Sequence, residues 1–202
     1  MVALGEHYFS ERPTSPERRG LVRCVLRELE LEFLTSSGVF SHRRVDPGTA
    51  LLIESMVLPE EGSVLDLGCG YGPVGVAAGR LRPGLEVVLT DVNERAVELA
   101  RENLRRNGVA NGVALLGGLY GPVAGRRFDV VLSNPPFSAG FRGAVGPMVE
   151  GAEGHLVEGG SLQVVVRWGK GGRMVGALME DVFGGFEVLA RGGGYRVLMS
   201  VL

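Results

Sequence analysis

The stretch Ser63–Leu81, SVLDLGCGYGPVGVAAGRL, decides the fold. Its first part, SVLDLG, is a short apolar run typical of a buried strand. Its last part, PVGVAAGRL, has a helical pattern with Pro73 in the first turn. The glycines between them allow a ligand to approach the backbone closely, and the start of a helix offers unpaired N–H groups. The stretch therefore predicts a strand, a ligand-binding loop and a helix.

The same alternation of strand and helix continues downstream. Apolar runs predict strands over 85–91, 113–117, 128–134 and 161–168, and helical periodicity predicts helices over 93–108, 143–160 and 172–184. The runs 186–190 and 195–202 flank RGGG, which predicts a hairpin. Alternating strands and helices indicate an α/β fold with a mostly parallel sheet covered on both faces, to which the hairpin adds an antiparallel strand.

The first sixty residues follow a different pattern. Residues 21–35 are compatible with an amphipathic helix, but Leu29, Leu31 and Phe33 alternate with glutamates, which is strand periodicity. We therefore favour a small hairpin, followed by a helix over 47–57. We expect one structural domain, in which an N-terminal extension (1–48) precedes a catalytic part (49–202).

Composition limits the classes of protein that remain. The chain has 202 residues, a net charge of −2, two cysteines and three scattered histidines. No apolar run approaches the ~20 residues of a membrane span, and no secretory signal is visible. These features favour a cytoplasmic protein with no metal site and no membrane association. The net charge argues against coating of nucleic acid by bulk charge, but leaves room for a local basic face.

The glycine loop and a later aspartate indicate the ligand. Gly70, Gly72 and Gly75 match G-x-G-x-x-G, which alone is weak evidence for a dinucleotide. Asp66 before the loop would repel a pyrophosphate and suits an ammonium group, while Asp91, roughly 20 residues on, is placed to bind ribose hydroxyls. A nucleoside with a cationic tail and no phosphate fits both, and S-adenosylmethionine is such a molecule. The alternative is a tight turn beside a surface charge.

Cys69 lies inside this loop and has two interpretations. A cysteine at a helix N-terminus can be a nucleophile with a lowered pKa. It can also be a small packed side chain, which we favour.

A second motif, DVVLSNPPF, ends a strand on Asn134, Pro135, Pro136 and Phe137. An ordinary turn would explain these residue types. However, the glycine loop, Asp91 and this motif all follow strands, and ligands of open α/β sheets bind beyond the carboxyl ends of the strands. We expect the Asn134 side-chain oxygen and the Pro135 carbonyl to accept hydrogen bonds from an exocyclic amine, on a loop stiffened by prolines, while Phe137 stacks on the base.

Taken in order, DLGCGYG, TDVN and SNPPF resemble class I S-adenosylmethionine-dependent methyltransferases that methylate nitrogen. More narrowly, the chain resembles the RsmC-type ribosomal RNA guanine-N2 methyltransferases, also in HYFSERP, SGVFSHRRVDPGTALL and GGYRVL. The resemblance implies a Rossmann-like fold whose seven-stranded sheet has an antiparallel last strand, and a target-base slot at 134–137. It implies cofactor contacts from Asp66, Gly68, Gly70, Gly72 and Asp91.

The resemblance also covers the segment before the sheet, and at one position this chain differs from the family pattern. Phe40, Asp46 and Thr49 resemble residues that close over the pocket, although Asp46 is equally a turn or helix-cap residue. Where the family often has an acid near the adenine amino group, this chain has Gly118. We therefore expect Leu119 or Val92 to pack on adenine, and Cys69 and Asn134 to border the cofactor.

Scattered cations are the candidate RNA contacts. Individually each is a solvated charge, but as a set on one edge they can bind phosphates. The set is Arg44, Arg142 and Lys170, with Arg18, Arg19, His42, Arg43 and Arg167 as further candidates. His7 and Tyr8 either pack on the cofactor or belong to an N-terminal strand.

The leading prediction is methylation of guanine N2 in ribosomal RNA of the small subunit, with S-adenosylmethionine as cofactor. DNA adenine-N6 and protein glutamine-N5 methylation use the same asparagine–proline geometry and stay open. A catalytically silent cofactor-binding module, or a ribosome assembly factor, is the alternative of a different class. Extra N-terminal domains occur in longer family members, so the RNA target is also open.

Overall fold

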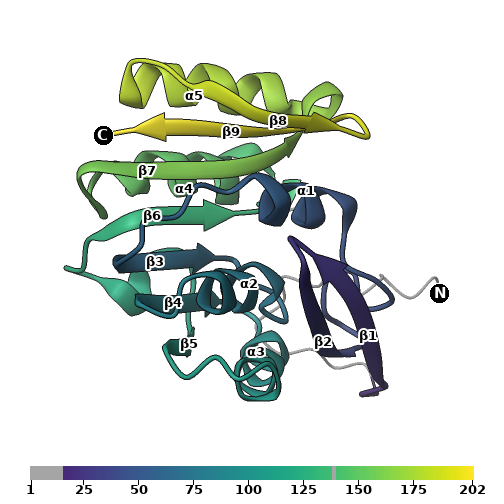
Figure 1. The fold of residues 1–202 in the computed structure, drawn as a ribbon. Helices are drawn as coiled ribbons and strands as arrows, with labels where there is room; N and C mark the ends of the chain where they lie inside the picture. Colours follow the sequence, from purple (N-terminus) through teal and green to yellow (C-terminus); the bar gives the residue numbers. More distant parts are fainter. Residues whose placement is uncertain (1–15, 138–139) are drawn as a thin grey trace.

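The computed structural model describes residues 16–137 and 140–202, and a seven-stranded sheet of order β5-β4-β3-β6-β7-β9-β8 forms its centre (Figure 1). Five strands run parallel: β3 (Gly62–Leu67), β4 (Leu85–Asp91), β5 (Gly112–Leu116), β6 (Phe128–Ser133) and β7 (Leu156–Arg167). The last strand, β9 (Tyr195–Val201), lies antiparallel between β7 and β8 (Glu187–Gly192). The predicted Rossmann-like sheet, with its antiparallel last strand, is confirmed.

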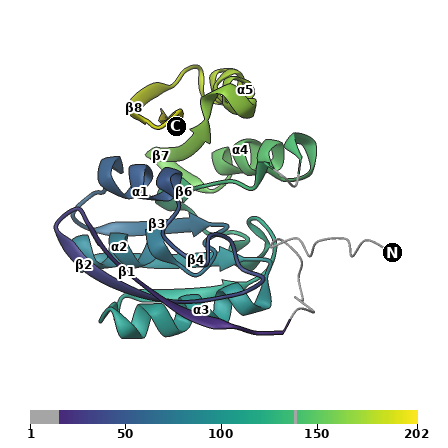
Figure 2. The ribbon, with the colours of Figure 1, turned by 90° about the vertical axis from the view of Figure 1, so that its right-hand side faces the viewer.

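Five α-helices cover the two faces of this sheet. On one face lie α1 (Pro47–Ser55), α2 (Pro73–Leu81) and α3 (Glu94–Arg106), and on the other α4 (Gly146–Glu153) and α5 (Arg173–Phe183) (Figures 1 and 2). Each face has its own hydrophobic core, represented by Leu52 and Leu99 on the first and by Val149 and Met179 on the second. The strand order reverses between β3 and β6, and such a switch point is where α/β sheets bind ligands.

The helix predicted over 143–160 is partly wrong. A π-helical turn, η3 (Phe141–Val145), precedes the short α4, and β7 already begins at Leu156. The early strand is stabilised by pairing, because Leu156 lies opposite Phe128 of β6 and the Gly160 carbonyl accepts a hydrogen bond from Leu202. Two further short elements that the periodicity did not predict are η1 (Gly121–Val123) and η4 (Trp168–Gly172).

The N-terminal hairpin is confirmed. Strands β1 (Arg19–Leu26) and β2 (Leu29–Ser36) pair antiparallel across a two-residue turn. The turn residues Arg27 and Glu28 have φ of 52° and 65°, as tight hairpin turns require. Leu31 and Phe33 are 3% and 0% exposed and belong to the core formed with α2 and α3, so the alternating pattern reflects a strand with one buried face.

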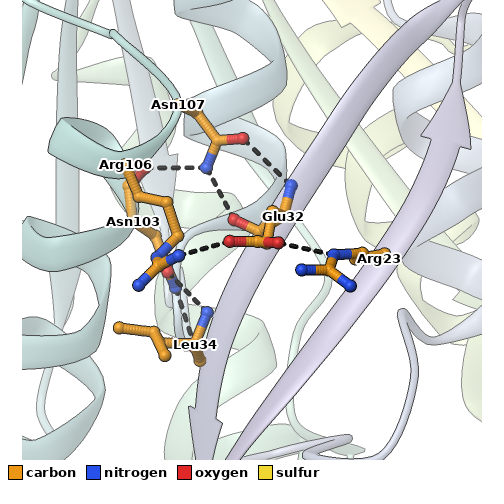
Figure 3. A network of polar contacts seen from close by, with 6 residues as sticks. All are labelled: Arg23, Glu32, Leu34, Asn103, Arg106 and Asn107. Carbon is orange, nitrogen blue, oxygen red and sulfur yellow. Dashed lines mark hydrogen bonds and ion pairs between the residues drawn. The ribbon is translucent and has the colours of Figure 1, made fainter.

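Two asparagines, Asn103 on α3 and Asn107 at its C-cap, join the hairpin to the main fold (Figure 3). Asn103 donates to the Leu34 carbonyl and accepts from the Leu34 N–H, at 2.9 and 2.7 Å, and Asn107 does the same with Glu32. Four helical residues advance about 6 Å and two strand residues about 7 Å, so the spacings match. The side chains therefore satisfy the free edge of β2 and fix the hairpin over the sheet.

The described residues contain neither a helix that could span a membrane nor a cluster of metal-binding side chains. Among residues 16–137 and 140–202 no helix is long and apolar enough to cross a membrane. The same residues contain no group of three or more His, Cys, Asp or Glu side chains placed to hold a metal ion.

Candidate active site

A cavity of about 690 Å³ lies at the carboxyl edge of the sheet. Its walls come from the ends of β3, β4, β6 and β7, from the start of α1 and from residues 39–41. The volume is in the range of small-molecule sites. The glycine loop, Asp91 and the motif at 134–137, which are far apart in the sequence, therefore meet in one place.

The glycine loop forms the floor of this cavity. The N–H groups of Gly68 and Cys69 both donate to the Thr90 carbonyl at 2.9 Å, which joins the loop to the end of β4. Gly68 and Gly70 have φ of 73° and 57°, and a Cβ at either position would meet no atom within 4 Å. The loop is thus an open backbone cradle, shaped for a ligand that comes closer than a side chain would permit.

Gly72 does not line the cavity, in contrast to its predicted cofactor contact. A Cβ on Gly72 would lie 3.1 Å from Leu89 and 3.2 Å from Ala100. Gly75 is even tighter, with a Cβ position 2.6 Å from Leu89. These two glycines let α2 pack closely on β4 and α3, so their place in the motif serves helix packing.

Two carboxyl groups lie beside the cradle. Asp66 is 2% exposed and accepts a hydrogen bond from the Gly75 N–H at 2.8 Å. Desolvation, and to a lesser extent the negative charge of Asp91, raises the pKa of Asp66 to about 7, against the opposing effect of the Gly75 N–H. Asp91 accepts from the N–H groups of Gly70 and Asn93, each at 2.8 Å, and desolvation raises its pKa too. Buried acids of this kind favour a cationic ligand.

Cys69 is a packed thiol. Its side chain is buried and donates to the Gly70 carbonyl at 3.3 Å. Burial raises the pKa of Cys69 well above its ordinary value, and the neighbouring Asp91 and Asp66 raise it further. A protonated thiol is a poor nucleophile, so the packed interpretation holds over the nucleophilic one.

Asn134 is held at the opposite wall by residues of the α1 start. Its amide nitrogen donates to Thr49 Oγ1 at 2.9 Å and to Asp46 Oδ2 at 3.3 Å. An ionised carboxylate can only accept, so this pairing assigns the NH2 group to the α1 side. Within the described part of the chain no donor occupies Asn134 Oδ1, so among these residues the oxygen is left for a ligand.

Asp46 performs two tasks at once. It is the N-cap of α1, because Oδ2 accepts from the N–H groups of Gly48 and Thr49 at 2.8 and 3.2 Å. The same oxygen accepts from Asn134. Of the two interpretations of Asp46 the cap is confirmed, and it also fixes the asparagine. This link was not predicted.

The two prolines and Phe137 continue the wall. The Pro135 carbonyl accepts from the Phe137 N–H at 3.0 Å, and a carbonyl has a second lone pair for another donor. Pro136 and Phe137 line the cavity. A Cβ on Gly171 would lie 2.9 Å from the Phe137 ring, so this ring packs on η4.

The segment before α1, residues 39–41, covers one side of the cavity. Val39, Phe40 and Ser41 line it, and Phe40 is 36% exposed. The segment is anchored to the start of α3, because Asn93 Nδ2 donates to the Gly38 carbonyl at 3.0 Å and an Arg95 guanidinium nitrogen donates to the Ser37 carbonyl at 2.7 Å. Val92, Gly118 and Leu119 line the neighbouring wall, where adenine was expected.

Only some of the residues predicted to contact RNA line the cavity. Lys170 and Arg167 line the cavity, whereas Arg44 and Arg142 do not. Tyr195 lines it and was missed, although the first residue of an antiparallel last strand must lie at the carboxyl edge. The Arg167 guanidinium lies 5.8 Å from the centre of its ring. His7, Tyr8 and the HYFSERP motif lie outside the described residues.

A sheet of this order, with a glycine cradle, two buried acids and an asparagine–proline slot at its switch point, defines a class I S-adenosylmethionine-dependent methyltransferase. The chain belongs to the methyltransferase small domain family, whose model matches residues 30–199. It is 36% identical to the uncharacterized protein YbxB of Bacillus subtilis over 98% of both chains. It is 34% identical to ribosomal RNA small subunit methyltransferase C of Serratia proteamaculans, over 86% of this chain and 49% of that protein.

A solved structure agrees with this assignment. The Thermus thermophilus 16S rRNA N2 methyltransferase RsmC, in complex with AdoMet and guanosine, superimposes with a TM-score of 0.77 at 28% identity. The match covers 93% of this chain and 51% of that chain. The chain thus spans about half the length of the RsmC proteins it resembles. It is an S-adenosylmethionine-dependent methyltransferase of the RsmC-like kind.

Proposed function

We propose that this enzyme methylates N2 of guanine in ribosomal RNA of the small subunit. The observation that carries the proposal is the fixed amide of Asn134, whose NH2 group binds Thr49 and Asp46 and whose oxygen, beside the Pro135 carbonyl, accepts from no donor among the described residues. Two rigid acceptors side by side match the two N–H groups of an exocyclic amine. The guanosine bound to the similar T. thermophilus enzyme supports guanine as the base.

The cavity residues fit the cofactor. S-adenosylmethionine, when bound, supplies a methyl group on a positively charged sulfur. We assign the cradle of Gly68 and Gly70 to its backbone-facing side, Asp91 to the ribose hydroxyls, and Asp66 to the ammonium group, directly or through water. Val92 and Leu119 pack on adenine, since Gly118 offers no acid to bind its amino group.

The slot overcomes the weak nucleophilicity of the target. The lone pair of a guanine amino group is delocalised into the ring. Asn134 Oδ1 and the Pro135 carbonyl together hold both N–H groups, which directs the nitrogen lone pair at the methyl carbon. Phe137 stacks on the base. No strong base is required, because the amine loses its proton to water after attack.

A transfer assay tests this function. Tritiated S-adenosylmethionine is supplied with RNA, DNA or protein from cells that lack the enzyme. We expect label in small-subunit RNA, and mass spectrometry should locate it in an N2-methylguanosine. Label in DNA adenine or in protein glutamine would contradict the substrate. Cofactor binding without transfer to any fraction would favour the silent module or assembly factor.

Thr49→Val should lower kcat about 5–10-fold and leave cofactor affinity unchanged. Thr49 is 5% exposed, and the substitution keeps its shape while removing the 2.9 Å hydrogen bond to Asn134. One neutral hydrogen bond contributes about 1 kcal/mol. Steady-state kinetics and calorimetry measure both quantities. Thr49→Ser should restore activity, and failure of this rescue would mean that Thr49 acts through packing alone.

Affinity for S-adenosylmethionine should fall as pH falls below about 7. Below that pH the ligand-free protein holds a proton on Asp66, whose pKa is raised to about 7, and a cationic ligand must displace it. Each pH unit then costs up to about tenfold in affinity. Calorimetry between roughly pH 5.5 and 7.5 should show this slope in the wild type and a flat profile in Asp66→Asn. Equal slopes would remove Asp66 from the ammonium site.

A further inference from the structure

Beyond the catalytic cavity, three arginines and an indole gather around the turn between β8 and β9. They are Trp168 in η4, Arg173 at the start of α5, Arg191 in β8 and Arg196 in β9. The Arg196 guanidinium lies over the Trp168 ring, 3.8 Å from its centre. This contact holds the guanidinium flat on an aromatic surface. We call these four residues the arginine platform.

The fold keeps these cations together at an energetic cost. Arg191 and Arg196 are direct partners in the β8–β9 pairing, and like charges opposite each other destabilise a sheet. Arg173 is the first residue of α5, where the helix dipole disfavours a cation. Burial, then Arg191 and Arg173, lower the pKa of Arg196. Among the ion pairs of the described residues none involves the platform. An external anion would relieve this repulsion.

The surface beside the platform is open. Gly193 and Gly194 form an exposed turn, and with Gly192, Trp168, Arg191 and Arg196 they line a shallow depression. The backbone N–H of Trp168 donates to the Gly194 carbonyl at 3.0 Å, which joins the turn to the start of η4. A glycine turn without side chains lets a sugar–phosphate backbone come close.

The platform is continuous with the catalytic cavity. Arg167 and Tyr195, which line that cavity, are the chain neighbours of Trp168 and Arg196. Tyr195 also lines the depression beside the platform, so a strand that places one base in the Asn134 slot reaches the platform with its next nucleotides. This continuity favours the nucleic acid that carries the target base over an unrelated acidic partner.

We propose that the arginine platform binds the single-stranded RNA nucleotides that flank the target guanine. A flanking base stacks on the Arg196 guanidinium, which Trp168 supports from below, and Arg191 and Arg173 bind the adjoining phosphates. Single-stranded RNA is favoured because its bases are free to stack on such a surface. The inference rests on the proposed function for the identity of the RNA.

Fluorescence anisotropy with a labelled short single-stranded RNA that contains one guanine tests the platform without requiring catalysis. Arg173→Gln with Arg191→Gln should weaken binding about 25-fold at ~0.1 M salt and reduce the slope of log affinity against log salt by about 1.4, the value for two phosphate contacts. Trp168→Leu should weaken binding with little change of slope. Affinity for S-adenosylmethionine and methylation of free guanosine should stay at wild-type values in both variants.

The matched control is Arg105→Gln with Arg126→Gln, which removes the same charge from an exposed position on α3 and a half-buried position before β6. An equal loss in this control, unchanged RNA affinity in the platform variants, or equal binding of polyglutamate would each overturn the inference. Equally strong binding of duplex RNA would overturn the single-stranded part. A wild type that binds the RNA through the platform but methylates neither RNA nor guanosine would leave the platform intact and refute the proposed function.

Discussion

Asn134→Ala should lower kcat about 10²–10³-fold while the Kd of S-adenosylmethionine stays nearly unchanged. The effect is large because the substitution removes a preorganised acceptor that acts on the reacting amine. The side chain is fixed by Thr49 and Asp46, so its oxygen needs no reorganisation during the reaction. Cofactor affinity changes little because the cradle and both acids lie on other strands. Single-turnover kinetics and calorimetry measure the two quantities.

Asn111→Ala is the matched control for this variant. Asn111 also donates from its side-chain amide, in its case to the backbone carbonyls of Leu85 and Arg82, but it lies outside the residues that line the cavity. It should change stability and leave kcat near the wild-type value. Wild-type turnover in Asn134→Ala would contradict the role assigned to the slot.

Asp91→Ala should raise the Kd of S-adenosylmethionine about 10–100-fold, the second large effect. Loss of a charged hydrogen bond to the ribose accounts for about 1.5–3 kcal/mol. The substitution also frees the N–H groups of Gly70 and Asn93, which Asp91 binds at 2.8 Å, so the cradle loses part of its support. Calorimetry on the folded variant gives the affinity, and thermal unfolding shows how much stability changes.

Two variants separate ligand contact from loss of structure. Asp91→Asn keeps a side chain that can hydrogen-bond and should fall between the wild type and Asp91→Ala. Asp181→Ala, an exposed acid on α5, should bind the cofactor as the wild type does. Equal affinity in Asp91→Ala and the wild type would remove Asp91 from the site.

Local sequence patterns predicted those helices and strands whose first and last residues are marked by proline, glycine or a change of periodicity. Helix α2 has the predicted bounds because Pro73 and the preceding glycine mark its start. Hairpin β1–β2 followed from alternation, since Phe33 and Leu31 are buried and their neighbours along the strand are more exposed. The end of α4 was not predicted, because nothing in the local sequence distinguishes its glycines from Gly159 and Gly160. Those two glycines belong to β7 and form backbone hydrogen bonds with Leu202.

The site could be predicted from the sequence only for residues that directly follow the carboxyl ends of the strands. The cradle, Asp91 and the Asn134 motif meet because parallel strands end at one edge. The bond between Asn134 and Thr49 joins residues 85 positions apart, and such a tertiary contact leaves no local pattern. Gly72 was expected at the cofactor and is instead closely packed outside the cavity lining, because packing glycines and ligand-binding glycines look alike in the motif.

The most direct test of the central claim is a crystal structure with guanosine and an unreactive S-adenosylmethionine analogue. The account predicts Asn134 Oδ1 and the Pro135 carbonyl oxygen each at about 2.7–3.2 Å from guanine N2, with that nitrogen facing the sulfur side of the cofactor. A structure in which the Asn134 side chain faces the core or bulk solvent, with N2 bound by other groups, would contradict it.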